Sequence, residues 1–96
     1  MSFEKLKGEI VSVATVAGEM VGRLVEIGDH TLTLSSPCTV IPSQDNGSGG
    51  LHPAVCLTGN VPVNEADVFY SGIVTVVKTN SDVERVWQKA TSGIIL

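Results

Sequence analysis

Short apolar runs rich in valine, isoleucine and threonine, separated by glycine-containing turns, make up the first part of the chain. Residues 9–16 form the first run and residues 20–27 the second, and residues 17–19 between them are typical of a tight turn. Residues 28–29 are a hairpin-turn signal, and residues 31–35 then alternate strictly between polar and apolar side chains. Three such strands joined by two short turns predict an antiparallel meander.

Two residues within these runs predict irregular points in the strands. Gly22 lies inside the second run, where a glycine usually marks a sharp bend, a bulge or a close approach of two backbones. Pro37 interrupts the third run before it resumes at residues 38–41, so we expect a bulge or a sheet edge at Pro37.

The next part of the chain divides into a polar stretch and a strongly apolar one. Residues 42–53 are rich in glycine, serine and proline and predict a flexible loop, followed by a short strand candidate at 54–57 and a loop at 58–67. Residues 68–77 form the last extended run, which has Gly72 in its middle and apolar side chains on both faces. A half-exposed strand should alternate, so this pattern in a small domain indicates that a partner chain covers one face.

The periodicity changes near the C-terminus, where residues 81–92 predict a helix. Ser81 and Glu84 match a capping box, which places Ser81 at the N-cap. Gly93 ends the helix, and the apolar residues 94–96 are expected to dock rather than remain in water. We expect the apolar face of the helix to pack on the domain itself, with partner binding as the alternative. The residues of that face follow the helical spacing i, i+3, i+4 and i+7, and they are Val83, Val86, Trp87 and Ala90.

The composition is that of one folded domain, residues 1–96, with 43% hydrophobic and 17% charged residues. It is apolar enough for part of the surface to be buried against another chain. The net charge is −4, and the six lysines and arginines form no basic run. A single subunit therefore lacks the cationic face that strong nucleic-acid binding needs, although a ring would gather one cation per subunit around its axis.

Few residues point to catalysis or to a bound cofactor. His30 and His52 are isolated and no pattern of converging ligands appears, so we expect neither a metal site nor a cofactor. No serine lies in a nucleophile elbow and no carboxylate pair is evident, so the chain is not expected to be an enzyme. Cys38 and Cys56 favour two buried reduced thiols, with a disulfide as the alternative if their strands are neighbours. The N-terminal residues lack an apolar signal core, and no apolar run approaches the length of a membrane span, which predicts a cytoplasmic protein.

Two short motifs resemble those of the Sm/LSm family. The first comprises Gly18, Gly22-Arg23-Leu24, Asp29 and the alternating leucines at 32 and 34, and the second is Phe69-Tyr70-Ser71-Gly72-Ile73-Val74. The resemblance implies an all-β fold, a small and strongly bent five-stranded antiparallel barrel, here with a C-terminal α-helix. It also implies a homo-oligomeric ring of about five to seven copies, closed by strand pairing between subunits. Similar small Sm-like proteins are associated with phages of marine cyanobacteria.

The resemblance also implies where RNA and neighbouring subunits bind. Charge for RNA binding would come from Arg23 or Lys78. Thr31 stands where the family has an RNA-contacting asparagine, and Ser71 stands where it has an arginine that stacks on bases. The RNA-binding candidates are Asp29, His30, Thr31, Ser71 and Gly72. The candidates for the subunit interface are Val68, Tyr70, Ile73, Val74 and Val76.

Three functions remain open on the sequence alone. The first is an Sm-like ring that binds RNA or single-stranded nucleic acid through an altered site. The second is a ring of phage origin with a structural, assembly or protein-binding role and no RNA. The third is a monomeric β-barrel that binds a small ligand. None of the three involves a membrane.

Overall fold

The computed structural model describes residues 3–42, 49–53 and 64–91. Six strands, two 3-10 turns and one α-helix make up this part of the chain. In chain order they are η1 (Glu4–Leu6), β1 (Ile10–Thr15), β2 (Gly18–Ile27), β3 (Thr31–Pro42), β4 (Gly49–His52), β5 (Glu65–Phe69), η2 (Tyr70–Gly72), β6 (Ile73–Lys78) and α1 (Ser81–Thr91). No helix in the described ranges is both long and apolar enough to cross a membrane.

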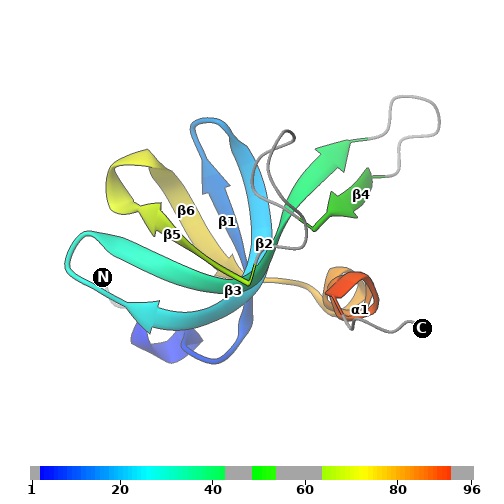
Figure 1. The fold of residues 1–96 in the computed structure, drawn as a ribbon, viewed down its shortest axis with the longest axis horizontal. Coiled ribbons are helices and arrows are strands. Elements are labelled where there is room, and N and C mark those ends of the chain that lie inside the picture. The colour runs from blue at the N-terminus through cyan, green and yellow to red at the C-terminus, as the bar shows by residue number, and fades with distance from the viewer. Residues whose placement is uncertain (1–2, 43–48, 54–63, 92–96) are drawn as a thin grey trace.

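All the strands belong to one antiparallel sheet, in the order β4-β3-β2-β1-β6, with β5 paired to β3 as well (Figure 1). The long strand β3 pairs with β5 through residues 31–35 and with β4 through residues 39–42. The predicted meander of the first three strands is thus confirmed, as are the mostly β class and the C-terminal helix. The described sheet differs from the expected strongly bent five-stranded barrel. It has six strands, it is not strongly curled, and it is not closed, because β5 and β6 do not pair with each other.

Two segments differ from the sequence prediction. The run predicted over 68–77 is two strands, β5 and β6, separated by the 3-10 turn η2 at Gly72, and β5 begins within the loop predicted over 58–67. Within the loop predicted over 42–53, residues 49–52 form β4. Backbone pairing with the extended end of β3 makes this strand, which two glycines would not favour by propensity alone. The strand candidate at 54–57 and the apolar end at 94–96 lie outside the described residues.

The irregularity predicted at Gly22 and Pro37 is one feature, a β-bulge between β2 and β3. Val21 pairs with Cys38 and Arg23 pairs with Ser35, so Gly22 alone lies opposite both Ser36 and Pro37. A Cβ atom on Gly22 would lie 3.2 Å from the Ser35 carbonyl oxygen and 3.3 Å from the Pro37 Cα. These contacts are tighter than a Cβ atom usually makes, so the close approach of the two backbones favours glycine at this position, as the sequence predicted.

The sheet buries apolar side chains on both faces. We call the larger group the inner cluster; it consists of Val11, Val13, Leu24, Leu32, Leu34 and Val68. The helix cluster lies on the opposite face, beneath α1, and consists of Ile10, Val21, Cys38 and Trp87. Consecutive residues of β1 thus point into different clusters, which explains why this strand is apolar on both sides.

Helix α1 is anchored by Trp87, whose side chain is only 6% exposed. Its indole Nε1 donates a hydrogen bond of 2.9 Å to the Ser36 carbonyl oxygen, at the bulge. The Arg23 guanidinium lies 5.6 Å from the centre of the Trp87 ring. The buried part of the apolar helix face is narrower than the sequence predicted, because Val86 remains 50% exposed and Ala90 is exposed as well.

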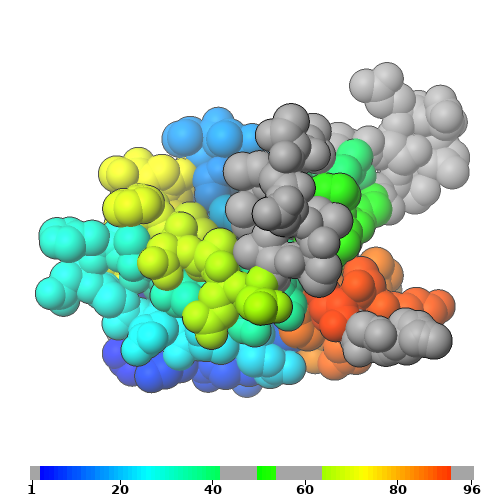
Figure 2. Space-filling model, in the orientation of Figure 1, coloured from blue at the N-terminus to red at the C-terminus, as the bar shows by residue number. Residues whose placement is uncertain are grey.

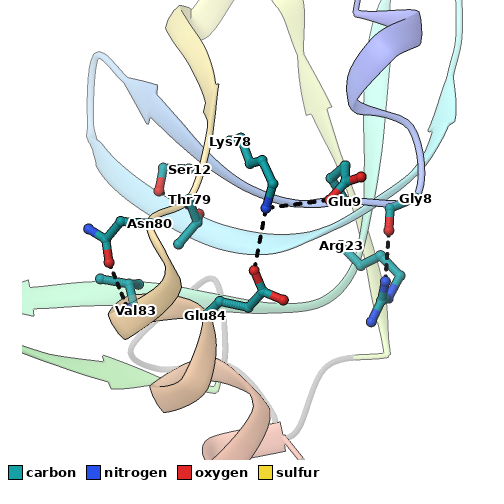
Figure 3. A network of polar contacts seen from close by, with 9 residues as sticks. All are labelled: Gly8, Glu9, Ser12, Arg23, Lys78, Thr79, Asn80, Val83 and Glu84. Carbon is teal, nitrogen blue, oxygen red and sulfur yellow. Dashed lines mark hydrogen bonds and ion pairs between the residues drawn. The ribbon is translucent and has the colours of Figure 1, made fainter.

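The N-terminus of α1 is capped one residue earlier than the sequence predicted. The Asn80 Oδ1 accepts a hydrogen bond of 2.9 Å from the Val83 backbone N–H, so Asn80 and not Ser81 is the N-cap (Figure 3). Lys78, at the end of β6, lies between two carboxylates, 3.4 Å from Glu9 and 3.5 Å from Glu84. These contacts join the first turn of the helix to the end of the sheet.

Cys38 is a free, fully buried thiol in the helix cluster. Burial raises the pKa of this thiol from 9.0 to about 11, so it stays protonated at neutral pH. Cys56, its possible disulfide partner, lies outside the described residues.

Candidate functional site

The turn between β2 and β3 carries three of the five RNA-binding candidates. The Gly28 backbone N–H donates to the Thr31 carbonyl oxygen at 2.8 Å, which closes the turn. Asp29 and His30 project from it and are exposed, whereas Thr31 is half-buried at the start of β3. The turn therefore presents a carboxylate and an imidazole to solvent side by side.

Tyr70 joins this turn to η2, which carries the other two candidates. Its backbone N–H donates to the His30 carbonyl oxygen at 2.9 Å, and its hydroxyl donates to the Gly28 carbonyl oxygen at 2.6 Å. The Tyr70 ring also stacks on Phe3, with the ring centres 6.0 Å apart. Three segments that are far apart in the sequence thus meet at one tyrosine.

Ser71 and Gly72 follow Tyr70 but line a different feature. The Gly72 carbonyl oxygen accepts a hydrogen bond of 3.0 Å from the Val16 backbone N–H, in the turn between β1 and β2. A mostly apolar hollow of about 430 Å³ opens beside them, and we call it the edge hollow. It is lined by Thr15, Val16, Ala17, Met20, Ala66, Asp67, Val68, Phe69, Ser71 and Gly72. The five candidates therefore occupy two neighbouring places rather than one site.

The two cations expected to supply charge are engaged elsewhere. The Arg23 Nη1 donates to the Gly8 carbonyl oxygen at 2.7 Å, and Lys78 lies between its two carboxylates. Lys78 is five residues beyond the start of β6, which places it roughly 17 Å along the strand from η2. Neither side chain is placed to contact a phosphate held at the turn.

Carboxylates surround the candidate residues instead. Thr33 pairs with Glu26 on one side and with Asp67 on the other, and its hydroxyl donates to the Asp67 carboxylate at 2.6 Å. Glu65 follows at the next outward position of β5. All three acids are exposed. This face of β2, β3 and β5 therefore repels phosphate groups.

Of the five residues predicted at a subunit interface, Val74 alone is strongly exposed, at 68%. Val68 belongs to the inner cluster, and Tyr70, Ile73 and Val76 pack against it. The sequence analysis missed two exposed apolar residues nearby, Phe69 at 64% and Val77 at 51%. The pairing of β6 with β1 is irregular opposite Ala14 and Thr15, so the alternation of side chains is interrupted there. As a result, positions 73 and 76 pack against the inner cluster, whereas positions 74 and 77 are exposed. Figure 2 shows β5, in yellow-green, on the surface of the molecule.

No three histidine, cysteine or acidic side chains converge on a possible metal position in the described ranges. No protein-family model matches the chain, and no curated protein matches its sequence.

Replacing Tyr70 with phenylalanine should loosen the turn without unfolding the domain. The variant keeps the stacking on Phe3 and the backbone bond to His30 but loses the hydroxyl bond to Gly28. We expect a loss of about 1 kcal/mol in the free energy of unfolding and faster amide hydrogen exchange within residues 28–31. Thr91→Val is the control, because it removes another hydroxyl bond at the far end of α1. Equal exchange at the turn in both variants would contradict the role assigned to Tyr70.

Proposed function

We propose that this chain is a non-enzymatic, Sm-like subunit that assembles with copies of itself into a closed ring. The observation that carries the proposal is the pair of strands β5 and β6, each hydrogen-bonded to the sheet along one edge only within the described residues. Val74 and Val77 lie exposed along one of these edges, and Phe69 lies at the end of the other. Unpaired edges beside exposed apolar side chains favour strand pairing with another chain.

The order of the strands supports the Sm-like assignment. The meander β1-β2-β3 carries β6 at one end and β5 on β3, and η2 alone connects β5 to β6. Within the described residues β5 pairs only with β3 and β6 only with β1, so the free edges of these two consecutive strands lie on opposite sides of the meander. Pairing β6 of one copy with β5 of the next would join subunits head to tail, and such an interface closes into a ring. The ring size expected for the family is about five to seven copies.

The charges on the two edges favour head-to-tail pairing over a symmetric dimer. β5 carries the exposed acids Glu65 and Asp67, whereas the exposed residues of β6 are Val74, Thr75, Val77 and Lys78 and include no acid. Pairing β5 with β5 would bring like charges together, which is unfavourable. Pairing β5 with β6 avoids this repulsion and brings Phe69 and the edge hollow against an apolar strand.

Replacing Val74 with aspartate should break the ring into monomers. The new carboxylate would face the acidic β5 edge of the neighbouring copy and would lose its hydration there. Light scattering after size-exclusion chromatography should give a mass of several subunits for the wild type and of one subunit for the variant. Val86→Asp is the matched control, because Val86 is also exposed but lies on α1. A wild type that is monomeric at micromolar concentration would rule out the ring.

A second candidate function is nucleic-acid binding at the turn between β2 and β3. The observation that favours it is the junction at Tyr70, which ties that turn to η2 and, through Phe3, to the N-terminal segment. Lys5 and Lys7 are exposed in this segment and are the candidate cations for this site. In a ring, these lysines would be repeated in every subunit, which partly offsets the acids on β5.

Titration with uridine-rich and adenine-rich oligonucleotides at low salt tests this second function. We expect saturable binding that weakens steeply with added salt and is lost in a Lys5→Gln, Lys7→Gln double variant. An Arg85→Gln, Lys89→Gln double variant controls for the change in net charge, because it also removes two positive charges but does so on the exposed part of α1. If the assembled wild type binds neither oligonucleotide, a structural or protein-binding role is left as the function of the ring.

A further inference from the structure

A second hollow, of about 330 Å³, lies between α1 and the outer face of the sheet, and we call it the helix hollow. We propose that it binds a small organic ammonium ion, a molecule with an apolar body and a protonated amine. Its lining consists of Ser12, Glu19, Val21, Val40, Gly50, Leu51, Asn80, Val83 and Val86. No residue of β5, η2 or β6 takes part, so the proposal does not depend on the ring.

The walls of the helix hollow are apolar and come from separate elements. Val40 of β3 pairs with Leu51 of β4, and Val21 of β2 is fully buried at the base. Val83 and Val86 contribute from α1, and Val86 remains 50% exposed although it faces this lining. A hollow of this volume with mostly apolar walls has the dimensions and character of a small-molecule site.

Among the described residues that line the hollow, Glu19 alone is ionisable. Glu19 pairs with Ala14 of β1. On its other side Met20 pairs with Thr39, which places Glu19 opposite Val40 of β3, and residues opposite each other have their side chains on the same face of the sheet. Within the described residues its carboxylate takes part in no hydrogen bond or ion pair, unlike the carboxylates of Glu9 and Glu84. A negative charge at the rim of an apolar hollow selects a cation and repels carboxylates and phosphates.

The polar groups of Ser12 and Asn80 in the lining already take part in hydrogen bonds within the protein. The Ser12 hydroxyl is 2.7 Å from the Thr79 hydroxyl and shares a hydrogen bond with it. The Asn80 Oδ1 is occupied by the helix cap, which leaves the amide nitrogen of Asn80 as a donor at the rim. A ligand would therefore place its amine on Glu19 and its hydrocarbon part against the valines and Leu51.

The test uses 2-phenylethylamine as the probe and 2-phenylethanol as its uncharged counterpart. Methyl-resolved NMR of the full chain should show saturable shifts confined to Val21, Val40, Leu51, Val83 and Val86 on adding the amine. The alcohol should bind about three- to fivefold more weakly, because it cannot pair with the carboxylate. Equal affinity for the two probes, or no saturable shift at millimolar amine, would overturn the proposal.

Three variants locate the site. Glu19→Gln should bring the affinity for the amine down to that for the alcohol, and Val86→Lys should abolish binding of the amine. Gln88→Lys makes the same change of charge on α1 outside the hollow lining and should leave binding unchanged. Trp87 fluorescence checks that each variant is folded, since it is the single tryptophan of the chain. Undiminished binding in both Glu19→Gln and Val86→Lys would place the amine elsewhere and overturn the assignment.

Discussion

Replacing Trp87 with alanine should destabilise the domain by about 3–5 kcal/mol and release α1 from the sheet. The indole is 6% exposed and packs in the helix cluster with Ile10, Val21 and Cys38. Its loss leaves a cavity on that face and removes the hydrogen bond to Ser36. The stacked Arg23 also loses its aromatic partner. Urea unfolding followed by far-UV circular dichroism measures the change, because the variant has no tryptophan fluorescence.

Trp87→Phe separates packing from the hydrogen bond. Phenylalanine keeps much of the buried area but cannot donate to the Ser36 carbonyl oxygen, so we expect a smaller loss of about 1–2 kcal/mol. Hydrogen exchange should show α1 protected in Trp87→Phe and unprotected in Trp87→Ala. If Trp87→Ala unfolds at the same urea concentration as the wild type, the helix is not anchored through this residue.

Replacing Gly22 with valine should destabilise the domain by about 2–3 kcal/mol, through steric overlap at the bulge. The added Cβ would lie 3.2 Å from the Leu34 Cβ, in addition to the contacts with Ser35 and Pro37. Two of these three neighbours are backbone atoms, so they cannot move aside as a flexible side chain would. The strands around the bulge must therefore move apart by a few tenths of an ångström to accept the larger side chain.

Gly50→Val is the matched control for this substitution. Gly50 lies in β4, and a Cβ atom added there has no heavy atom of the described residues within 4 Å. We expect a change within about 1 kcal/mol, with the higher strand propensity of valine as the main contribution. Chemical denaturation of both variants tests the comparison, and equal losses in the two would refute the steric argument at Gly22.

Patterns in the sequence correctly predicted the elements whose signals are local. The first three strands and the helix follow from period-two and period-3.6 alternation. Gly22 and Pro37 each indicated a bulge or close approach, and they meet at the same bulge. The cap of α1 was placed one residue late, because Asn80 and Ser81 are both good N-cap residues and only the geometry distinguishes them.

Other features depend on contacts between distant segments. β4 contains two glycines and exists because β3 extends far enough to pair with it. The apolar run 68–77 is broken because β5 pairs with β3 whereas β6 pairs with β1. The partners of the charged groups also depend on tertiary contacts. The sequence suggested Arg23 and Lys78 as cations for RNA binding, but Arg23 donates to the Gly8 carbonyl oxygen. Lys78 forms ion pairs with Glu9 and Glu84.

The sequence by itself determined the β meander, the bulge glycine and the amphipathic helix, because each depends on residues adjacent or nearly adjacent in the chain. It also placed Asp29 and His30 at the turn before the third strand, but it put Tyr70 inside a continuous strand over 68–77. Only the tertiary structure decided that Tyr70 joins the turn to η2, that the edges of β5 and β6 are unpaired in the described chain, and that Glu19 borders an apolar hollow. Those features arise where residues tens of positions apart pack together, and alternation along the chain carries no information about such contacts.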